Sequence, residues 1–217
     1  MKGRSKGIQI EADQRQLRQI EKKLKGMKSE MPKVLSRAAN RTAVGARLAL
    51  NKKMRQTYTV KSGKLKQNMA IKRATYSSPV AKITLIGKPQ AASYFKYTKG
   101  GQGGAKLQIR RDRPLKAIGS STGRKAFVAQ MPSGHVGIYQ RRKGEYMDKS
   151  PRLSKPNINK KTQHTEKLRQ FFGPSSAKMA EIVFGGKKAY SAALEEETQK
   201  LFQKNLDAQI RYVLSKK

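Results

Sequence analysis

The distribution of acidic residues constrains this chain more than any other feature. Residues 31–111 contain no Asp or Glu but carry 19 Lys and Arg, and residues 113–144 again contain no acid. Ordinary surface helices mix positive and negative side chains, and residues of opposite charge three or four positions apart form stabilising ion pairs. These two stretches cannot form such pairs within themselves. A fold built on them therefore presents a nearly pure cationic surface, between terminal thirds in which the acids cluster.

The total charge indicates an anionic neighbour. The 217 residues include 50 Lys and Arg against 13 Asp and Glu, which gives a formal net charge of +37. A free protein of this charge repels itself strongly. Nucleic acid is the first candidate partner, because its phosphates attract Lys and Arg without any reading of sequence. A solvated basic surface without such a partner is the alternative.

Composition excludes several classes of protein. The chain has no cysteine, which excludes a disulfide framework, a thiolate nucleophile and a cysteine-based zinc site. No apolar run approaches the roughly 18 residues of a membrane span, and no apolar segment follows the basic N-terminus as in a signal peptide. We therefore expect a protein that is neither secreted nor membrane-spanning and that uses no metal or cofactor.

The groups needed for catalysis are scarce in the sequence. A nuclease needs clustered carboxylates to hold metal ions, and the middle of the chain offers only Asp112. His135, Ser121 and Ser133 have no evident partner that would activate them. The glycine-rich segment 99–106 lacks the Lys-Ser or Lys-Thr ending of a phosphate-binding loop and is better interpreted as a hairpin tip. We predict no enzymatic activity.

Hydrophobic periodicity predicts an α+β fold. It consists of N-terminal helices, a small, mostly antiparallel sheet of four to five strands, an extended basic arm and a long C-terminal helix. The predicted helices span residues 11–31, 32–56, 62–68, 174–183 and 189–214. The predicted strands span residues 70–75, 80–86, 107–111, 126–131 and 136–140, with 92–96 as a further edge. The last two full strands form the strongest hairpin signal.

The chain length predicts one domain with an appended segment. Residues 1–140 form its helix–sheet core, and residues 171–217 form C-terminal helices that pack on the same domain. Residues 141–170, which we call the basic arm, have almost no apolar content and include Pro151 and Pro156. We expect the basic arm to be extended and to serve assembly.

Two sets of cations are candidate contact residues. The candidates for contacts with the DNA backbone are Arg37, Arg41, Arg47, Lys99, Lys106, Arg110 and Arg111. The candidates for assembly contacts in the basic arm are Arg141, Arg142, Lys143, Lys149, Arg152, Lys155, Lys160 and Lys161. The aromatic cluster of Tyr94, Phe95 and Tyr97 is either a stacking platform for single-stranded nucleic acid or a piece of core with its edge.

Four segments resemble the phage minor tail protein Z family. They are the hairpin at 123–142, the Phe-Phe-Gly-Pro-Ser segment at 171–175, the helical segment at 38–43 and the approach to a strand at 69–74. They occur in the same order as in the family and extend over most of residues 32–215. The resemblance implies an α+β fold related to other tail-completion proteins, which often work as sixfold rings.

The resemblance also implies a function and partners. Members of the family are virion proteins of tailed phages that complete the tail and join it to the head. The expected partners are other copies of the chain, as a hexamer, and neck and tail proteins such as a tail terminator, a tail tube or a head-side connector. Assembly would take place in the host cytoplasm. The alternative from composition alone is a basic nucleic-acid-binding protein of ribosomal or nucleoid type.

Overall fold

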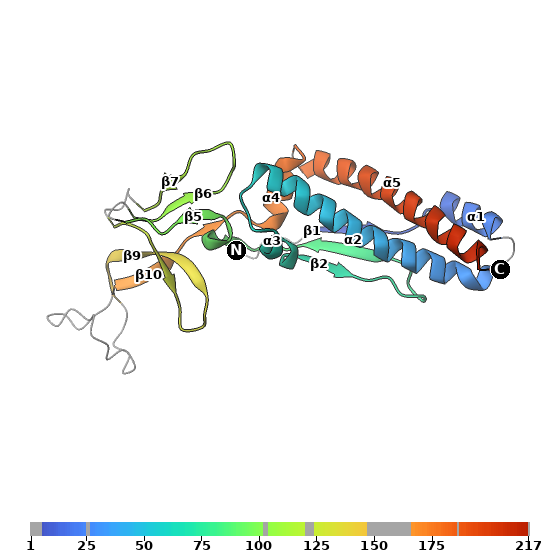
Figure 1. Cartoon of the computed structure of the whole chain (residues 1–217), viewed down its shortest axis with the longest axis horizontal. Helices are drawn as coiled ribbons and strands as arrows, with labels where there is room; N and C mark the ends of the chain where they lie inside the picture. The colour runs from blue at the N-terminus through green and yellow to red at the C-terminus, as the bar shows by residue number, and fades with distance from the viewer. Residues whose placement is uncertain are drawn as a thin grey trace. The chain divides into compact units, whose positions relative to one another are not determined.

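The computed structural model describes residues 6–24, 27–101, 104–119, 124–146, 166–185 and 187–216. The chain forms two compact units, labelled by element in Figure 1. The helical unit contains residues 1–57, 61–89 and 174–217, and the β unit contains residues 58–60 and 90–173. The predicted division of one domain into residues 1–140, 141–170 and 171–217 stays a prediction.

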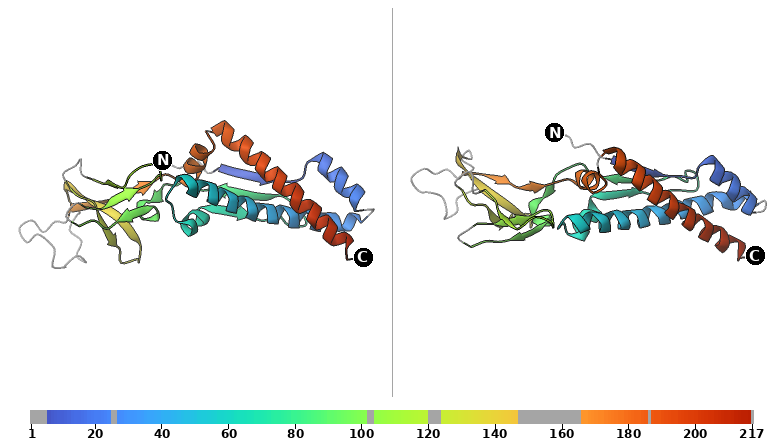
Figure 2. Two further views of the ribbon diagram at one scale, coloured as in Figure 1. Left: turned by 45° about the horizontal axis from the view of Figure 1, so that its top comes forward. Right: turned by 90° about the horizontal axis from the view of Figure 1, so that it is seen from above.

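Two long helices dominate the helical unit. Helix α2 (Met31–Thr57) and helix α5 (Lys187–Leu214) run side by side in Figures 1 and 2. The buried face of α2 is rich in alanine, and Ala38, Ala39 and Ala43 are fully buried. Small side chains at these positions let the helix backbone approach its neighbours closely. At Gly45 a Cβ atom would lie 2.7 Å from Leu201 Cδ2 of α5, so a side chain at this position would have to displace Leu201.

A three-stranded antiparallel sheet packs against α2. Its strand order is β1 (Lys6–Ile10), β3 (Ala81–Leu85) and β2 (Met69–Lys72), with β3 in the centre. Ile8 and Ile71 both pair in register with Ile83. Along β3 the buried residues alternate with more exposed ones, because successive side chains of a strand point to opposite faces.

Shorter helices complete the helical unit. Helix α1 (Gln14–Lys23) begins with a capping box, in which the Gln16 amide donates to Asp13 Oδ1 at 2.7 Å and the Asp13 amide donates to Gln16 Oε1 at 3.0 Å. A 3-10 turn, η1 (Lys28–Glu30), precedes α2, and α3 (Ser62–Gln67) precedes β2. Helix α4 (Ser176–Val183) starts at Ser175, whose hydroxyl accepts from the Lys178 amide.

The β unit is built from three small antiparallel sheets. The first sheet has the strand order β5 (Lys96–Thr98), β6 (Lys106–Gln108) and β7 (Lys116–Ala117). The second has the order β10 (Glu166–Gln170), β9 (Val136–Tyr146) and β8 (Phe127–Gln130). The third pairs β4 (Gln90–Ala91) with β11 (Phe172–Gly173). A 3-10 turn, η2 (Ala92–Tyr94), lies between β4 and β5. A small core of Ala92, Ala105, Ala126 and Ile138 lies within this unit. At Gly173 a Cβ atom would lie 2.4 Å from the Phe95 ring, so only glycine fits there.

The α+β class and the long C-terminal helix are confirmed. The predicted helices 32–56 and 189–214 match α2 and α5 within two residues at each end, and the predicted hairpin at 126–140 is present as β8 and β9. The predicted helix over 11–31 is present as α1 but is shorter than predicted, because it ends at Lys23 with Leu24 as its C-cap.

The predicted count of four to five strands is also wrong. The described residues contain eleven strands in four sheets. Several of the additional strands are only two or three residues long, which is too short for an alternating pattern to be recognised. The ends of the basic arm are paired strands, since β9 continues to Tyr146 and β10 begins at Glu166. Residues 147–165 lie outside the described residues.

The close approach of α2 and α5 predicts a penalty for a bulky side chain at Gly45. Overpacking costs about 1–3 kcal/mol, while leaving glycine in a helix returns at most about 1 kcal/mol. We therefore expect Gly45→Leu to lower the free energy of unfolding, as measured by denaturant titration. The added substitution Leu201→Ala should recover part of the loss. Ala49→Leu, on the exposed face of α2, is the control, and an equal loss there would contradict this packing.

Asn40 ties α2 to the segment that follows β2. Its Nδ2 donates to the Ala74 carbonyl at 3.0 Å, and its Oδ1 accepts from the Ala74 amide at 2.8 Å. Ala74 is buried, so Asn40→Ala would leave both of its backbone groups without a partner. Because each unsatisfied buried group costs about 1–3 kcal/mol, we expect a measurable loss of stability on thermal or chemical unfolding. Gln56→Ala, at an exposed position of α2, should have little effect, and similar losses would refute the role of Asn40.

Candidate anion-binding grooves on the helical unit

One face of α2 carries cations that have few acidic neighbours. Arg37, Arg41, Val44 and Leu48 are spaced three or four residues apart, so they share this face, and all four are exposed. Val44 and Leu48 retain 40% and 48% of their accessible surface. Arg47 points elsewhere and is half-buried, and its Nε is buried without a hydrogen-bond partner among the described residues. The structure thus brings Arg37 and Arg41 together and separates Arg47 from them.

A groove of about 440 Å³ opens beside Arg41. Three guanidinium groups contribute to it, from Arg37 and Arg41 on α2 and from Arg73 just after β2. No acidic side chain lines it; the other lining residues are Asn40, Val44, Ile71 and Gln209. Guanidinium groups bind phosphate or carboxylate oxygens through paired N–H donors, so this groove is suited to an anion.

A second groove, of about 420 Å³, adjoins the first at Arg37. Its other cations are Lys33 and Lys216, and its single acid, Glu30, pairs with Lys33 at 2.8 Å. The remaining lining residues are Met27, Tyr76, Tyr212 and Val213. The two grooves together form a continuous cationic surface, which we call the Arg37 surface.

The pKa of the Tyr212 hydroxyl is lowered by the positive charges around it. Lys216 Nζ lies 4.9 Å from the centre of the Tyr212 ring. Hydrogen bonding to Lys216 and its charge lower the pKa of the Tyr212 hydroxyl, and Arg37 adds to this effect. Tyr76 and Tyr212 are both strongly exposed, so their rings are available to stack on a planar group beside the cations.

The other predicted DNA-contacting residues lie in the β unit. Lys99, Lys106 and Arg111 are exposed there. Arg110 is half-buried and forms a bidentate ion pair with Asp112, with Nε–Oδ1 and Nη2–Oδ2 distances of 3.0 and 2.8 Å. The one acid of the central stretch therefore neutralises one of the predicted contact residues.

The residues predicted for assembly are only partly described. Arg141 and Arg142 are exposed on β9, and Arg142 pairs with Glu145 at 2.9 Å. Lys143 also belongs to β9. The other predicted residues of the basic arm lie outside the described residues: Lys149, Arg152, Lys155, Lys160 and Lys161.

The aromatic cluster of the β unit belongs to its interior. Phe95 is 1% exposed, and Tyr97 packs against the small core. Tyr94 is half-buried. These positions favour the interpretation as core and edge over a stacking platform.

Sequence reasoning missed part of the Arg37 surface. Lys33 lies one helical turn before Arg37, so the periodicity of α2 could have identified it. Arg73, Tyr76, Tyr212 and Lys216 come from segments far away in the sequence, and only the tertiary structure brings them to the same surface.

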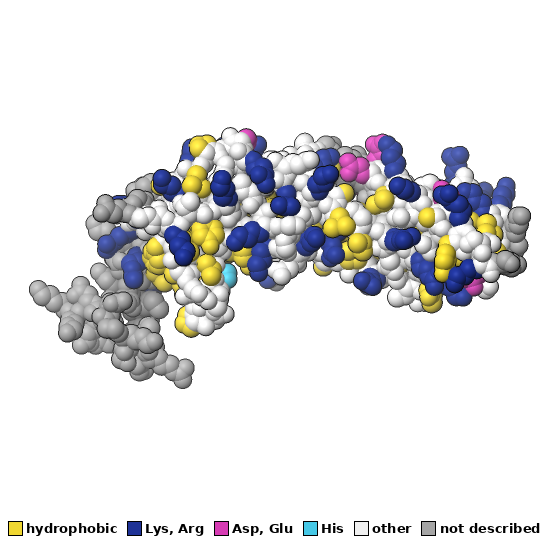
Figure 3. Space-filling model, in the orientation of Figure 1, with side chains coloured by type: hydrophobic (Ala, Val, Ile, Leu, Met, Phe, Trp, Pro, Cys, Tyr) yellow, Lys and Arg dark blue, Asp and Glu magenta, His cyan; other side chains and the backbone are white. Residues whose placement is uncertain are grey.

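Figure 3 shows how strongly Lys and Arg outnumber acids on one face of the molecule. Within the described part of the chain, no group of three or more His, Asp or Glu side chains is arranged to hold a metal ion. In the same part of the chain, no helix is both long enough and apolar enough to cross a membrane.

Comparison with known protein families identifies a family to which the chain is similar. Residues 15–216 match the model of the prophage minor tail protein Z family. No curated protein and no solved structure matches the chain significantly. The match extends over nearly the whole chain and includes all four segments in which the sequence resembles this family. The chain therefore belongs to the prophage minor tail protein Z family.

Proposed function

We propose that this phage tail protein completes the tail and joins it to the head, next to the end of the packaged DNA. The observation that carries the proposal is the match of residues 15–216 to the minor tail protein Z family, which supports a structural role in the tail and a place in the virion. In this role the protein acts by binding its neighbours and catalyses no reaction.

The Arg37 surface supports proximity to DNA. Double-stranded DNA carries one negative charge per about 1.7 Å of its axis, and Lys and Arg side chains neutralise it without base contacts. Arg37, Arg41 and Arg73 meet in one groove that no acid lines. A joining protein needs only this sequence-independent attraction, because it meets whatever sequence lies at the end of the genome.

A cyclic assembly fits the same role. Closed rings satisfy every interface of identical copies, and a ring surrounds a DNA end symmetrically. We propose a hexamer that contacts a tail terminator or tube on one side and a head-side connector on the other. Copies carrying +37 each repel one another, so the DNA or acidic surfaces of these partners must offset the repulsion.

A nucleic-acid-binding protein of ribosomal or nucleoid type is the second candidate. The charge of +37 and the exposed tyrosines of the Arg37 surface favour it. It predicts a monomer that binds RNA tightly with a steep salt dependence. The joining function instead predicts a ring that sediments with tails.

The first test of the joining function is genetic. We expect phage assembled without this protein to produce heads and tails that fail to join, scored by negative-stain imaging and by infectivity. Supplying the intact protein in trans should restore joined particles. Normal joining and infection without the protein would overturn the proposal.

The second test addresses the Arg37 surface. We expect the purified double variant Arg37→Gln/Arg41→Gln to bind linear duplex DNA more weakly. The slope of log K against log salt should decrease by about 0.9 for each phosphate that the variant no longer neutralises. The matched control is Lys22→Gln/Lys204→Gln, which removes two exposed cations of the same unit that line neither groove. Equal slopes for the two double variants would show that the Arg37 surface does not bind DNA.

A further inference from the structure

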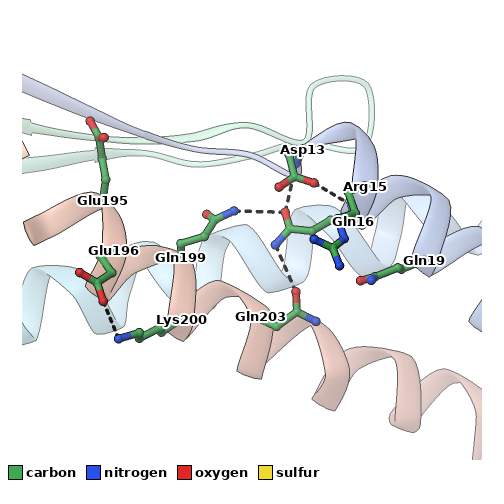
Figure 4. A pocket seen from close by; sticks show the side chains of 9 residues that line it. All are labelled: Asp13, Arg15, Gln16, Gln19, Glu195, Glu196, Gln199, Lys200 and Gln203. Atoms are coloured by element: carbon green, nitrogen blue, oxygen red, sulfur yellow. Dashed lines mark hydrogen bonds and ion pairs between the residues drawn. The ribbon is translucent and has the colours of Figure 1, made fainter. Parts of the chain in front are cut away.

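A third groove on the helical unit has a different chemistry. It lies between α1 and α5, has a volume of about 760 Å³ and is drawn in Figure 4. We call it the carboxylate–glutamine groove. Its lining residues are Asp13, Arg15, Gln16, Gln19, Glu195, Glu196, Gln199, Lys200 and Gln203. Its three acids outnumber its two cations, so its local charge is 2 − 3 = −1, against +37 for the chain.

The groove is held in shape by a chain of amide hydrogen bonds. Gln16 Nε2 donates to Gln203 Oε1 at 3.1 Å, and Gln199 Nε2 donates to Gln16 Oε1 at 3.3 Å. Gln16 is 8% exposed and is fixed from both sides, because Asp13 also bonds to it. The α1 and α5 walls of the groove are therefore tied together before any ligand binds.

Some carboxylate oxygens of the groove already have partners within the protein. Glu196 pairs with Lys200 at 2.6 Å, and this hydrogen bond lowers the pKa of the Glu196 carboxyl. Asp13 uses Oδ1 to cap α1. Glu195 is exposed on another side of α5 from Glu196 and makes no ion pair with any residue that the structure describes (Figure 4). Glu195 and Oδ2 of Asp13 are thus available to cations from outside.

This combination fits an extended basic peptide. The side-chain amide of Gln19, and the hydrogen-bonding capacity that Gln199 and Gln203 do not use within the protein, can both donate and accept hydrogen bonds, as the backbone of an extended peptide requires. The carboxylates would bind Lys or Arg side chains at the rim. Duplex DNA is repelled by the same carboxylates, so the groove and the Arg37 surface select opposite partners.

Residues 147–165 provide such a peptide. They contain five cations, Lys149, Arg152, Lys155, Lys160 and Lys161, against Asp148, which gives a charge of 5 − 1 = +4. Proline at positions 151 and 156 disfavours helix at the residue before it. Tyr146 and Glu166, which flank the segment, are paired in the β9–β10 ladder. With its ends held together, a segment of 19 residues can reach at most about 35 Å from the ladder.

We propose that the carboxylate–glutamine groove binds residues 147–165 of a neighbouring copy of the chain. This inference rests on the proposed cyclic assembly and names the contact that builds it. The groove and the segment are different surfaces, so each copy gives its segment to one neighbour and receives the segment of another. Such a head-to-tail contact closes into a ring when the rotation between copies permits.

The absence of cysteine from the chain makes a direct test available. Two single-cysteine variants, Ser154→Cys in the segment and Gln199→Cys in the groove, are purified separately, mixed at low salt and oxidised. We expect a disulfide-linked heterodimer in high yield. Lys204→Cys, an exposed position of α5 that does not line the groove, replaces Gln199→Cys in the matched control and should give little heterodimer.

Charge reversal tests the chemistry of the contact. Adding Glu195→Lys/Glu196→Lys to the Gln199→Cys chain should lower the yield severalfold, whereas Glu197→Lys, an exposed acid paired with Lys53, should leave it nearly unchanged. Equal yields for the Gln199→Cys and Lys204→Cys variants, or no effect of the reversal, would overturn the inference. So would a double variant carrying both Ser154→Cys and Gln199→Cys that crosslinks only within one chain.

The outcome is separable from the joining function. If phage lacking the protein fail to join heads to tails but the mixed variants do not crosslink, the proposed function stands and this contact is wrong. If the variants crosslink as expected but phage without the protein join normally, the contact stands as a self-association site and the joining function is wrong.

Discussion

The packing of α2 against α5 is the interaction on which the candidate sites depend. The Arg37 surface takes Lys33, Arg37 and Arg41 from α2 and Tyr212 from the end of α5, while the carboxylate–glutamine groove uses residues 195–203 of α5. Buried alanines and Gly45 let the two helices pack closely, and this packing sets the relative positions of the backbone segments that carry both sites. A binding surface built on packed helices holds its cations in place and so loses less entropy when a ligand binds.

Two of the few acids of the chain link neighbouring helices. Asp207 on α5 pairs with Lys23 of α1 at 2.8 Å, and Glu197 on α5 pairs with Lys53 of α2 at 3.4 Å. The hydrogen bond from Lys23 lowers the pKa of the Asp207 carboxyl. Exposed pairs of this kind contribute only about 0–1 kcal/mol each, so their main effect is to fix neighbours and to reduce repulsion. The much larger number of cations leaves most of the positive charge to serve contacts with other molecules.

Periodicity predicted the elements that have a long, one-sided apolar pattern. The helices α2 and α5 and the β8–β9 hairpin belong to this group, and Arg37 and Arg41 could be placed on one face from spacing alone. Strand β1 was missed although Ile8 and Ile10 alternate with polar residues, because its pattern is short. The grooves could not be predicted, since Arg37, Arg73 and Tyr212 meet only through tertiary packing. The extension of β9 to Tyr146 and the strand β10 were missed because exposed charged residues occur in both segments.

The helical unit is discontinuous in sequence, and this has a consequence for the order of synthesis. Its last part, residues 174–217, follows the 84 residues numbered 90–173 of the β unit. A ribosome adding about 5–20 residues per second needs roughly 4–17 s to pass this insertion. During that time α2 has no α5 to pack against, and none of the three grooves has its full lining. The chain thus acquires its binding surfaces only after the whole β unit has been synthesised.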